Sequence, residues 1–269
     1  MTADYHTHTP LCLHAEGSPT EYAQQAAKIG LDEIGLSDHS PMPEKLDDWR
    51  MLLSDLPNYL EMVEAARAAV PQIPVRLAME VDYFTDGHAW IEDLASRADW
   101  DYLIGSVHYI DQDSDRWDID NPEKTRRYVA TPNATAEIWD AYWKTYTHMA
   151  KSGLFDLLGH PDLPKKFGNR PEGDLRRFYE PAIQAAADAG VAIEINTAGW
   201  HKDAAEQYPA RPFLELMYQA DIPLSISSDA HHPSEVGRDF EKAIALAKDV
   251  GFTHTVRFQN RQRTLAPLP

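Results

Sequence analysis

Short apolar runs alternate with amphipathic stretches along most of the chain. The apolar runs predict a strand that ends at residue 6, and further strands at residues 33–37, 75–81, 102–107, 155–158, 191–195 and 224–227, with another candidate at 254–258. The stretches between them carry hydrophobic residues at helical spacing and predict helices at residues 20–29, 57–70, 88–98, 135–151, 174–189, 211–219 and 239–250. Glycines just past several of these stretches, such as Gly30 and Gly190, are typical of helix ends.

This alternation predicts an α/β fold with parallel strands. Strands that alternate with helices pair in parallel through right-handed crossovers. Seven or eight such units in 269 residues favour a closed barrel over an open sheet. Because no linker or shift in composition divides the chain, we expect a single domain over residues 1–269. The polar segment 110–133 is expected to form a long loop over one face of the barrel.

Charge and composition narrow the possible functions. The chain has 43 acidic and 25 basic residues, a formal net charge of −18, so its surface repels nucleic acids and anionic membranes. We therefore expect no nucleic-acid or membrane partner, and the oligomeric state is left open. The single cysteine, Cys12, excludes a disulfide framework and is typical of a cytoplasmic protein. No signal peptide or membrane-spanning run is expected.

Residues that can bind metals follow the ends of the predicted strands. In chain order they are His6 and His8, then Asp38 and His39, Glu80, His108, His160, Asn196, and finally Asp229 and His231. Barrel enzymes build their active sites at this end of the strands. Each residue alone has an ordinary structural explanation, but their coincidence at one end of successive strands predicts a metal site. Glu80 is the strongest single candidate, because a carboxylate within a buried strand needs a partner.

The ordered motifs around these residues resemble those of the PHP (polymerase and histidinol phosphatase) superfamily. They are His6-Thr7-His8-x5-His14, Ser37-Asp38-His39, Glu80, Gly105-Ser106-Val107-His108, Gly159-His160-Pro161-Asp162 and Ser228-Asp229-Ala230-His231. The flanking stretches, such as Glu194-Ile195-Asn196-Thr197-Ala198-Gly199, are most similar to those of histidinol-phosphate phosphatases. The resemblance extends from residue 4 to about residue 238.

The resemblance implies a distorted TIM-like (β/α)7 barrel with three divalent metal ions at the carboxyl ends of its strands. By analogy, the first ion would be held by His6, His8, Glu80 and Asp229. Glu80 would bridge to a second ion, held also by His108 and His160, and the third would be held by His14, His39 and His231. Imidazole and carboxylate ligands without thiolate suit zinc, iron or manganese.

The resemblance also implies where the substrate is held. Family members often carry arginine where this chain has Lys165 and His201, so these two residues and Lys202 are the candidates for phosphate contact. Some relatives use an acidic residue near the position of His14. Glu16 is therefore a candidate substitute ligand or a substrate contact, and segment 110–133 is expected to offer further acceptors to a cationic substrate.

The activity that the resemblance implies is hydrolysis of L-histidinol phosphate to L-histidinol and phosphate, a late step of histidine biosynthesis. A metal-bridging hydroxide would attack phosphorus in line. Asp229 or His231 would pass a proton to the departing oxygen. Three divalent ions, two carboxylates and a hydroxide leave a charge of about +3 at the barrel mouth, which attracts a small phosphorylated substrate to an acidic protein.

Three alternatives stay open at this point. One is a PHP-type phosphoesterase that acts on nucleotides or other small phosphomonoesters, although the acidic surface argues against a long nucleic acid. Another is an amidohydrolase-type barrel, which also opens with His-x-His but usually carries a bridging lysine where this chain has His108. The last is a metal-binding protein without enzymatic activity, which a phosphatase assay would distinguish.

Overall fold

The computed structural model describes residues 2–112, 115–129 and 133–269. Within these residues a seven-stranded sheet has the order β1-β2-β3-β4-β7-β8-β9, with neighbouring strands parallel. The strands are β1 (Ala3–Asp4), β2 (Glu33–Leu36), β3 (Val75–Asp82), β4 (Tyr102–Ser106), β7 (Leu157–Leu158), β8 (Ala192–Asn196) and β9 (Leu224–Ser227). A parallel bridge between Thr7 and Ala230 joins the segments after β1 and β9 and so closes the ring. The predicted barrel is confirmed.

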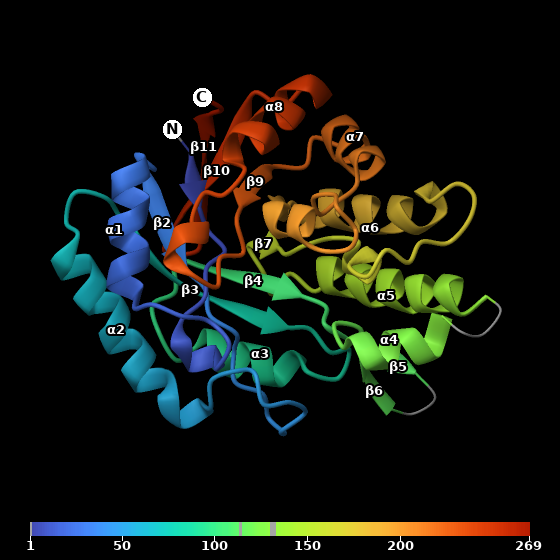
Figure 1. Ribbon diagram of the computed structural model, residues 1–269, viewed down its shortest axis with the longest axis horizontal. Helices are drawn as coiled ribbons and strands as arrows, with labels where there is room; N and C mark the ends of the chain where they lie inside the picture. The colour runs from blue at the N-terminus through green and yellow to red at the C-terminus, as the bar shows by residue number, and fades with distance from the viewer. Residues whose placement is uncertain (1, 113–114, 130–132) are drawn as a thin grey trace.

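Helices pack around the outside of this barrel (Figure 1). They are α1 (Pro19–Ile29), α2 (Leu56–Ala69), α3 (His88–Ala95), α4 (Pro122–Val129), α5 (Ala134–Lys151), α6 (Arg176–Ala189), α7 (Arg211–Gln219) and α8 (Phe240–Val250). Short 3-10 turns are η1 (Pro10–Cys12), η2 (Leu53–Asp55), η3 (Leu163–Lys165), η4 (Thr197–His201) and η5 (Pro233–Glu235). In the described part of the chain, no helix combines the length and apolar character that a membrane span requires.

The ends of α1 illustrate how local sequence sets a helix boundary. Ser18 accepts a hydrogen bond from the backbone of Glu21, whose side chain accepts one from the backbone of Ser18 at 2.6 Å. This reciprocal cap satisfies amide groups that the first turn leaves free. Gly30 ends the helix with a φ of 79°, a conformation that glycine adopts without strain.

The amino-terminal end of the barrel is filled by aromatic side chains. Tyr5 and Tyr102 pack against each other and against Phe258, with ring centroids 5.1–5.3 Å apart. Phe258 belongs to β10 (His254–Gln259), which pairs antiparallel with β11 (Gln262–Pro267). The strand expected at 254–258 therefore exists, but it is part of a hairpin outside the barrel sheet. Because this end is packed, the opposite end is left to form the site.

The expectation of a long loop at 110–133 is wrong for most of that segment. The structure has strands β5 (Tyr109–Gln112) and β6 (Asp115–Asp118), which pair antiparallel with each other, and helix α4. These strands belong to no larger sheet, and the segment is too polar overall to show the alternating apolar pattern by which a strand is predicted. Residues 113–114 and 130–132 of the expected loop lie outside the described residues.

Candidate metal centre

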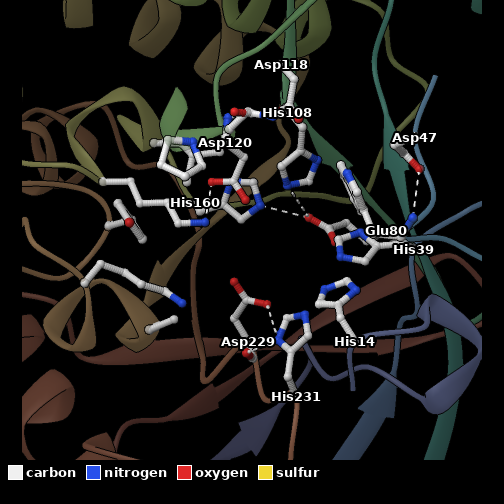
Figure 2. A pocket seen from close by; sticks show the side chains of 18 of the residues that line it. His14, His39, Asp47, Glu80, His108, Asp118, Asp120, His160, Asp229 and His231 are labelled. Atoms are coloured by element: carbon white, nitrogen blue, oxygen red, sulfur yellow. Dashed lines mark hydrogen bonds and ion pairs between the residues drawn. The ribbon is translucent and has the colours of Figure 1, made fainter. Parts of the chain in front are cut away.

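A cavity of about 760 Å³ opens at the carboxyl ends of the barrel strands (Figure 2). Most of the expected metal ligands line it: His14, His39, Glu80, His108, His160, Asp229 and His231. The other two, His6 and His8, are fully buried. Nε2 of His6 lies 3.3 Å from Glu80, and Nε2 of His8 lies 3.0 Å from Asp229. The structure therefore brings all nine expected residues together.

Most of these side chains lie at or near the end of a barrel strand. His39 follows β2 and forms a parallel backbone bridge with Glu80 of β3. His108 and His160 come just after β4 and β7. Asp229 follows β9 with a φ of 54°, in the left-handed region that non-glycine residues rarely adopt. Backbone strain of this kind concentrates at functional sites, where the surrounding structure holds it in place.

Glu80 lies between two groups of imidazoles. Its Oε1 atom is 2.8 Å from Nε2 of His160 and 3.7 Å from Nε2 of His108. Its Oε2 atom is 2.8 Å from Nδ1 of His39 and 3.3 Å from Nε2 of His6. Each oxygen thus faces its own set of nitrogen donors, which is the geometry that a carboxylate needs to bridge two cations.

A second layer of carboxylates orients the imidazoles. Nδ1 of His6 lies 3.0 Å from Glu194, and Nδ1 of His108 lies 2.9 Å from Asp82. Both rings consequently turn Nε2 towards Glu80. Carboxylates that hold the far nitrogen of a histidine fix its tautomer and are typical of metal sites. Neither Glu194 nor Asp82 was predicted from the sequence, although Glu194 is, like Glu80, a carboxylate within a buried strand.

His14 and His231 form the outer side of the cluster. Their rings lie 4.6 Å apart, and each Nδ1 atom lies within hydrogen-bond distance of a backbone carbonyl oxygen, that of Cys12 at 2.8 Å and that of Asp229 at 3.0 Å. When Nδ1 donates, Nε2 carries the lone pair that a metal requires. Ligand atoms of His231, His8 and His39 lie within 4.8 Å of one another.

Burial and neighbouring charges set the protonation of the cluster. Burial raises the pKa of Glu80, but the surrounding imidazoles, His39 first, outweigh it and hold the pKa well below its usual range. Burial lowers the pKa of His39, and burial together with the charge on His8 lowers the pKa of His231 to about 3. For His8, burial is outweighed by hydrogen bonds to Asp229 and other carboxylates, which raise the pKa to about 9. The carboxylates therefore attract positive charge into the site.

The donor set fits divalent metal ions. Buried atoms without a hydrogen-bond partner among the described residues include Nε2 of His6, Nδ1 of His39, Oε2 of Glu80 and Nδ1 of His160. An unsatisfied buried polar atom costs about 1–3 kcal/mol, and several in one cluster call for a common partner. A cation provides one, because each of these atoms can carry a lone pair.

Replacing Glu194 with Gln is expected to weaken metal binding about 10- to 100-fold, because the ring of His6 loses the charged partner that orients it. The measurement is metal affinity by competition with a chromophoric chelator. Glu180→Gln, on the exposed face of α6, is the matched control and should bind metal as the unmodified protein does. Unchanged affinity in Glu194→Gln would show that this contact is only structural.

Only one of the three cations expected to contact the substrate phosphate lines the cavity. Lys202 lines the cavity. Lys165 is fully buried and its ammonium group contacts Asp162, Glu206 and the carbonyl of Gln207 at 2.6–3.1 Å, so its three protons are already used. Nε2 of the exposed His201 lies 2.6 Å from Asp239. Lys165 and His201 are close in sequence to the expected metal ligands, but neither lines the cavity.

Glu16 is exposed and is not among the described residues that line the cavity. Its backbone, however, donates a hydrogen bond to the carbonyl oxygen of His231 at 2.8 Å. Trp49, Lys166 and Arg238, which the sequence did not single out, also line the cavity, as do Asp118 and Asp120 from the segment 110–133 that was expected to offer acceptors. Trp49, Lys166 and Arg238 lie outside the predicted strands and helices, where no periodic pattern distinguishes them from ordinary surface residues.

Comparison with known proteins identifies the family. A model described as PHP domain matches residues 4–198. The chain belongs to the PHP domain family. The resemblance found in the sequence is thus confirmed, and the match favours a PHP domain over an amidohydrolase-type barrel.

Relatives of this PHP chain cover nearly its whole length. It is 40% identical over 261 residues to a protein of Deinococcus radiodurans named "Probable histidinol-phosphatase", covering 96% of this chain and 97% of that one. It is 26% identical to the histidinol-phosphatase of Bacillus subtilis, covering 88% and 96%. The crystal structure of histidinol phosphate phosphatase from Lactococcus lactis, complexed with zinc, L-histidinol and phosphate, shares the fold, with a TM-score of 0.80, 20% identity and 98% coverage of both chains.

Proposed function

We propose that this chain is a divalent-metal-dependent phosphomonoesterase that hydrolyses L-histidinol phosphate to L-histidinol and phosphate, in histidine biosynthesis. The observation that carries the proposal is Glu80, which has imidazole groups on both oxygens at the base of an open cavity. The choice of substrate is supported by the names of relatives that align over nearly the whole chain. A single domain, residues 1–269, would carry the activity, and the lone Cys12 favours a cytoplasmic location.

Three divalent ions are proposed, held by the nine residues His6, His8, His14, His39, Glu80, His108, His160, Asp229 and His231. Zinc, iron and manganese all suit this donor set. When bound, such ions activate an attacking water and stabilise the charge on phosphoryl oxygens. The two carboxylate oxygens of Glu80 face different imidazoles, so Glu80 is the proposed bridge between the first two ions.

Asp229 and His231 are the proposed proton carriers. Their side chains are 17% and 28% exposed, so they reach the cavity, whereas His6 and His8 are completely covered. Burial raises the pKa of Asp229, but His6 and His8 outweigh it and hold the pKa well below its usual range. The group is therefore ionised at neutral pH, and it must take a proton from the attacking water before returning one to the departing alkoxide.

The far wall of the cavity offers acceptors for a cationic substrate. L-Histidinol phosphate carries an ammonium group and an imidazole in addition to the phosphate. Asp118 and Asp120, from the segment expected to provide such acceptors, line the cavity. Asp120 forms an ion pair with Lys166, whereas Asp118 accepts a backbone hydrogen bond from Asp120 at 2.8 Å and retains a second oxygen. Asp118 is the proposed partner of the ammonium group, and Lys202 is a proposed partner of the phosphate.

Replacing Asp118 with Asn is expected to lower kcat/KM for L-histidinol phosphate about 10- to 100-fold, because a charge-assisted hydrogen bond to the ammonium group is lost. The comparison substrate is p-nitrophenyl phosphate, which has no ammonium group, so the ratio of the two kcat/KM values should fall. Asp140→Asn, an exposed position on α5, is the matched control. An equal change for both substrates would remove the proposed role of Asp118.

The proposed function is tested with a panel of phosphomonoesters on the metal-loaded protein. We expect kcat/KM for L-histidinol phosphate to exceed that for AMP and p-nitrophenyl phosphate by about 100-fold or more, because a site that hydrogen-bonds polar groups rejects substrates without them. Equal or faster hydrolysis of nucleotides or aryl phosphates would contradict the substrate and leave only a phosphoesterase. No hydrolysis of any phosphomonoester would contradict the enzyme itself.

A further inference from the structure

The cationic side chains at the metal cavity differ in how they are already paired. Among the described residues that line it, the cations other than histidine are Lys124, Lys166, Lys202 and Arg238. Lys166 forms an ion pair with Asp120, and its charge is therefore compensated. Arg238 follows Asp229 and His231 in the segment that leads from β9 to α8. It is the only arginine among these described cavity residues.

The guanidinium group of Arg238 retains unused donors. Its Nη1 atom donates to Glu235 at 2.8 Å, and Glu235 in turn accepts a hydrogen bond from the backbone of His231 at 2.9 Å. Its Nε atom is buried and has no hydrogen-bond partner in the described part of the chain. The side chain is 26% exposed, and a guanidinium carries five N–H donors in a fixed plane, so donors other than the one used by Glu235 are left for a ligand. The link through Glu235 ties Arg238 to the loop that carries His231.

The backbone that carries Arg238 is anchored to the barrel on two sides. The amide of Gly237 donates to the buried carboxylate of Asp4 in β1 at 2.9 Å. The carbonyl oxygen of Arg238 itself accepts a hydrogen bond from the hydroxyl of Thr197 at 2.8 Å, at the carboxyl end of β8. These contacts fix the position of the residue before any ligand arrives, which lowers the entropy lost on binding.

A phosphoryl group is the ligand that matches this arrangement. Its oxygens are anionic and tetrahedrally arranged, and a planar guanidinium binds two of them through parallel hydrogen bonds. Arg238 also lies in the same cavity as Lys202, which adds a second positive charge. Of the three cations expected from sequence for this role, Lys165 and His201 have their polar groups committed to other side chains, which leaves Lys202.

We propose that Arg238 binds the phosphoryl group of the substrate through the donors that Glu235 leaves free, together with Lys202. This inference rests on the proposed function, because it takes a phosphomonoester as the ligand. Arg238 is accordingly a binding residue of the reaction, supplied from the β9–α8 segment.

The test compares Arg238→Ala with the unmodified protein, both loaded with metal. The dissociation constant of inorganic phosphate, measured by isothermal titration calorimetry, is expected to rise about 10- to 100-fold, and kcat/KM to fall by a similar factor. Guanidinium ion added to Arg238→Ala should restore part of the activity. Arg238→Lys should recover less, because lysine provides charge without the planar fork. Arg211→Ala, an exposed arginine paired with Glu215 outside the cavity, is the matched control.

The outcomes separate binding from a structural role. Unchanged metal content, weaker phosphate binding and rescue by guanidinium support the proposal. Phosphate binding equal to that of the unmodified protein overturns it, as does a loss of metal from Arg238→Ala that guanidinium does not restore. If the unmodified protein hydrolyses no phosphomonoester but binds phosphate through Arg238, the proposed function fails while the phosphate site stands.

Discussion

Glu80→Gln is expected to lose kcat/KM about 100- to 1000-fold, the equivalent of about 3–4 kcal/mol. The carboxylate contacts imidazoles on both oxygens and is 1% exposed. Solvent therefore cannot compensate for the loss of its negative charge. An amide keeps the shape of the side chain but presents N–H donors to one of the two groups. The proposed metal ions on both sides therefore lose a ligand at once, and both sites should weaken together.

The measurement pairs the steady-state kcat/KM of Glu80→Gln with its metal content by elemental analysis. Glu92→Gln, an exposed glutamate on α3, controls for the substitution itself and should match the unmodified protein. If Glu80→Gln retained full metal content and turnover, the bridging role of Glu80 would be wrong.

Removal of the metal is expected to abolish phosphatase activity and to lower the melting temperature. At a free metal concentration 1000 times Kd, one site contributes about 4 kcal/mol to the free energy of unfolding. In a chain of this size that corresponds to a shift in Tm of about 8–16 °C. The physical reason is the buried cluster, in which Oε2 of Glu80 and Nε2 of His6 make no hydrogen bond to any of the described residues.

The experiment dialyses the protein against a strong chelator, verifies the loss of metal, and then adds single ions back. Zinc, manganese or iron should restore activity and Tm together. Magnesium, which prefers oxygen ligands in octahedral geometry, should not. Full activity in verified metal-free protein would contradict the metal centre altogether.

The barrel was predictable because its strands bury both faces and are separated by helices of regular period. Even β7, which has only two paired residues, was found from the apolar run at 155–158. The hairpins were not predictable in the same way. Strands β5 and β6 pair only with each other, and β10 carries the buried Phe258 but pairs with an exposed partner strand, so the periodic signal does not reveal their topology.

The clustering of the nine expected residues was predictable because parallel strands bring their carboxyl ends to one place, whatever the separation in sequence. The carboxylates that orient the imidazoles were harder to predict. In the sequence Asp82 is an ordinary polar residue at the end of a strand, and only its contact with His108 in the structure reveals its role. The cationic residues that line the cavity were the hardest to predict. Lys165 follows a ligand motif closely, yet its ammonium group turns to Asp162 and Glu206, whereas Arg238 lies beyond the last motif and lines the cavity.

The most direct test of the metal centre is anomalous X-ray diffraction from crystals of the protein loaded with zinc or manganese. We predict a three-metal centre, with three anomalous peaks at about 2.0–2.3 Å from nitrogen and oxygen atoms of the nine residues and with Glu80 between the first two. A single peak at full occupancy, or metal bound away from Glu80, would contradict it.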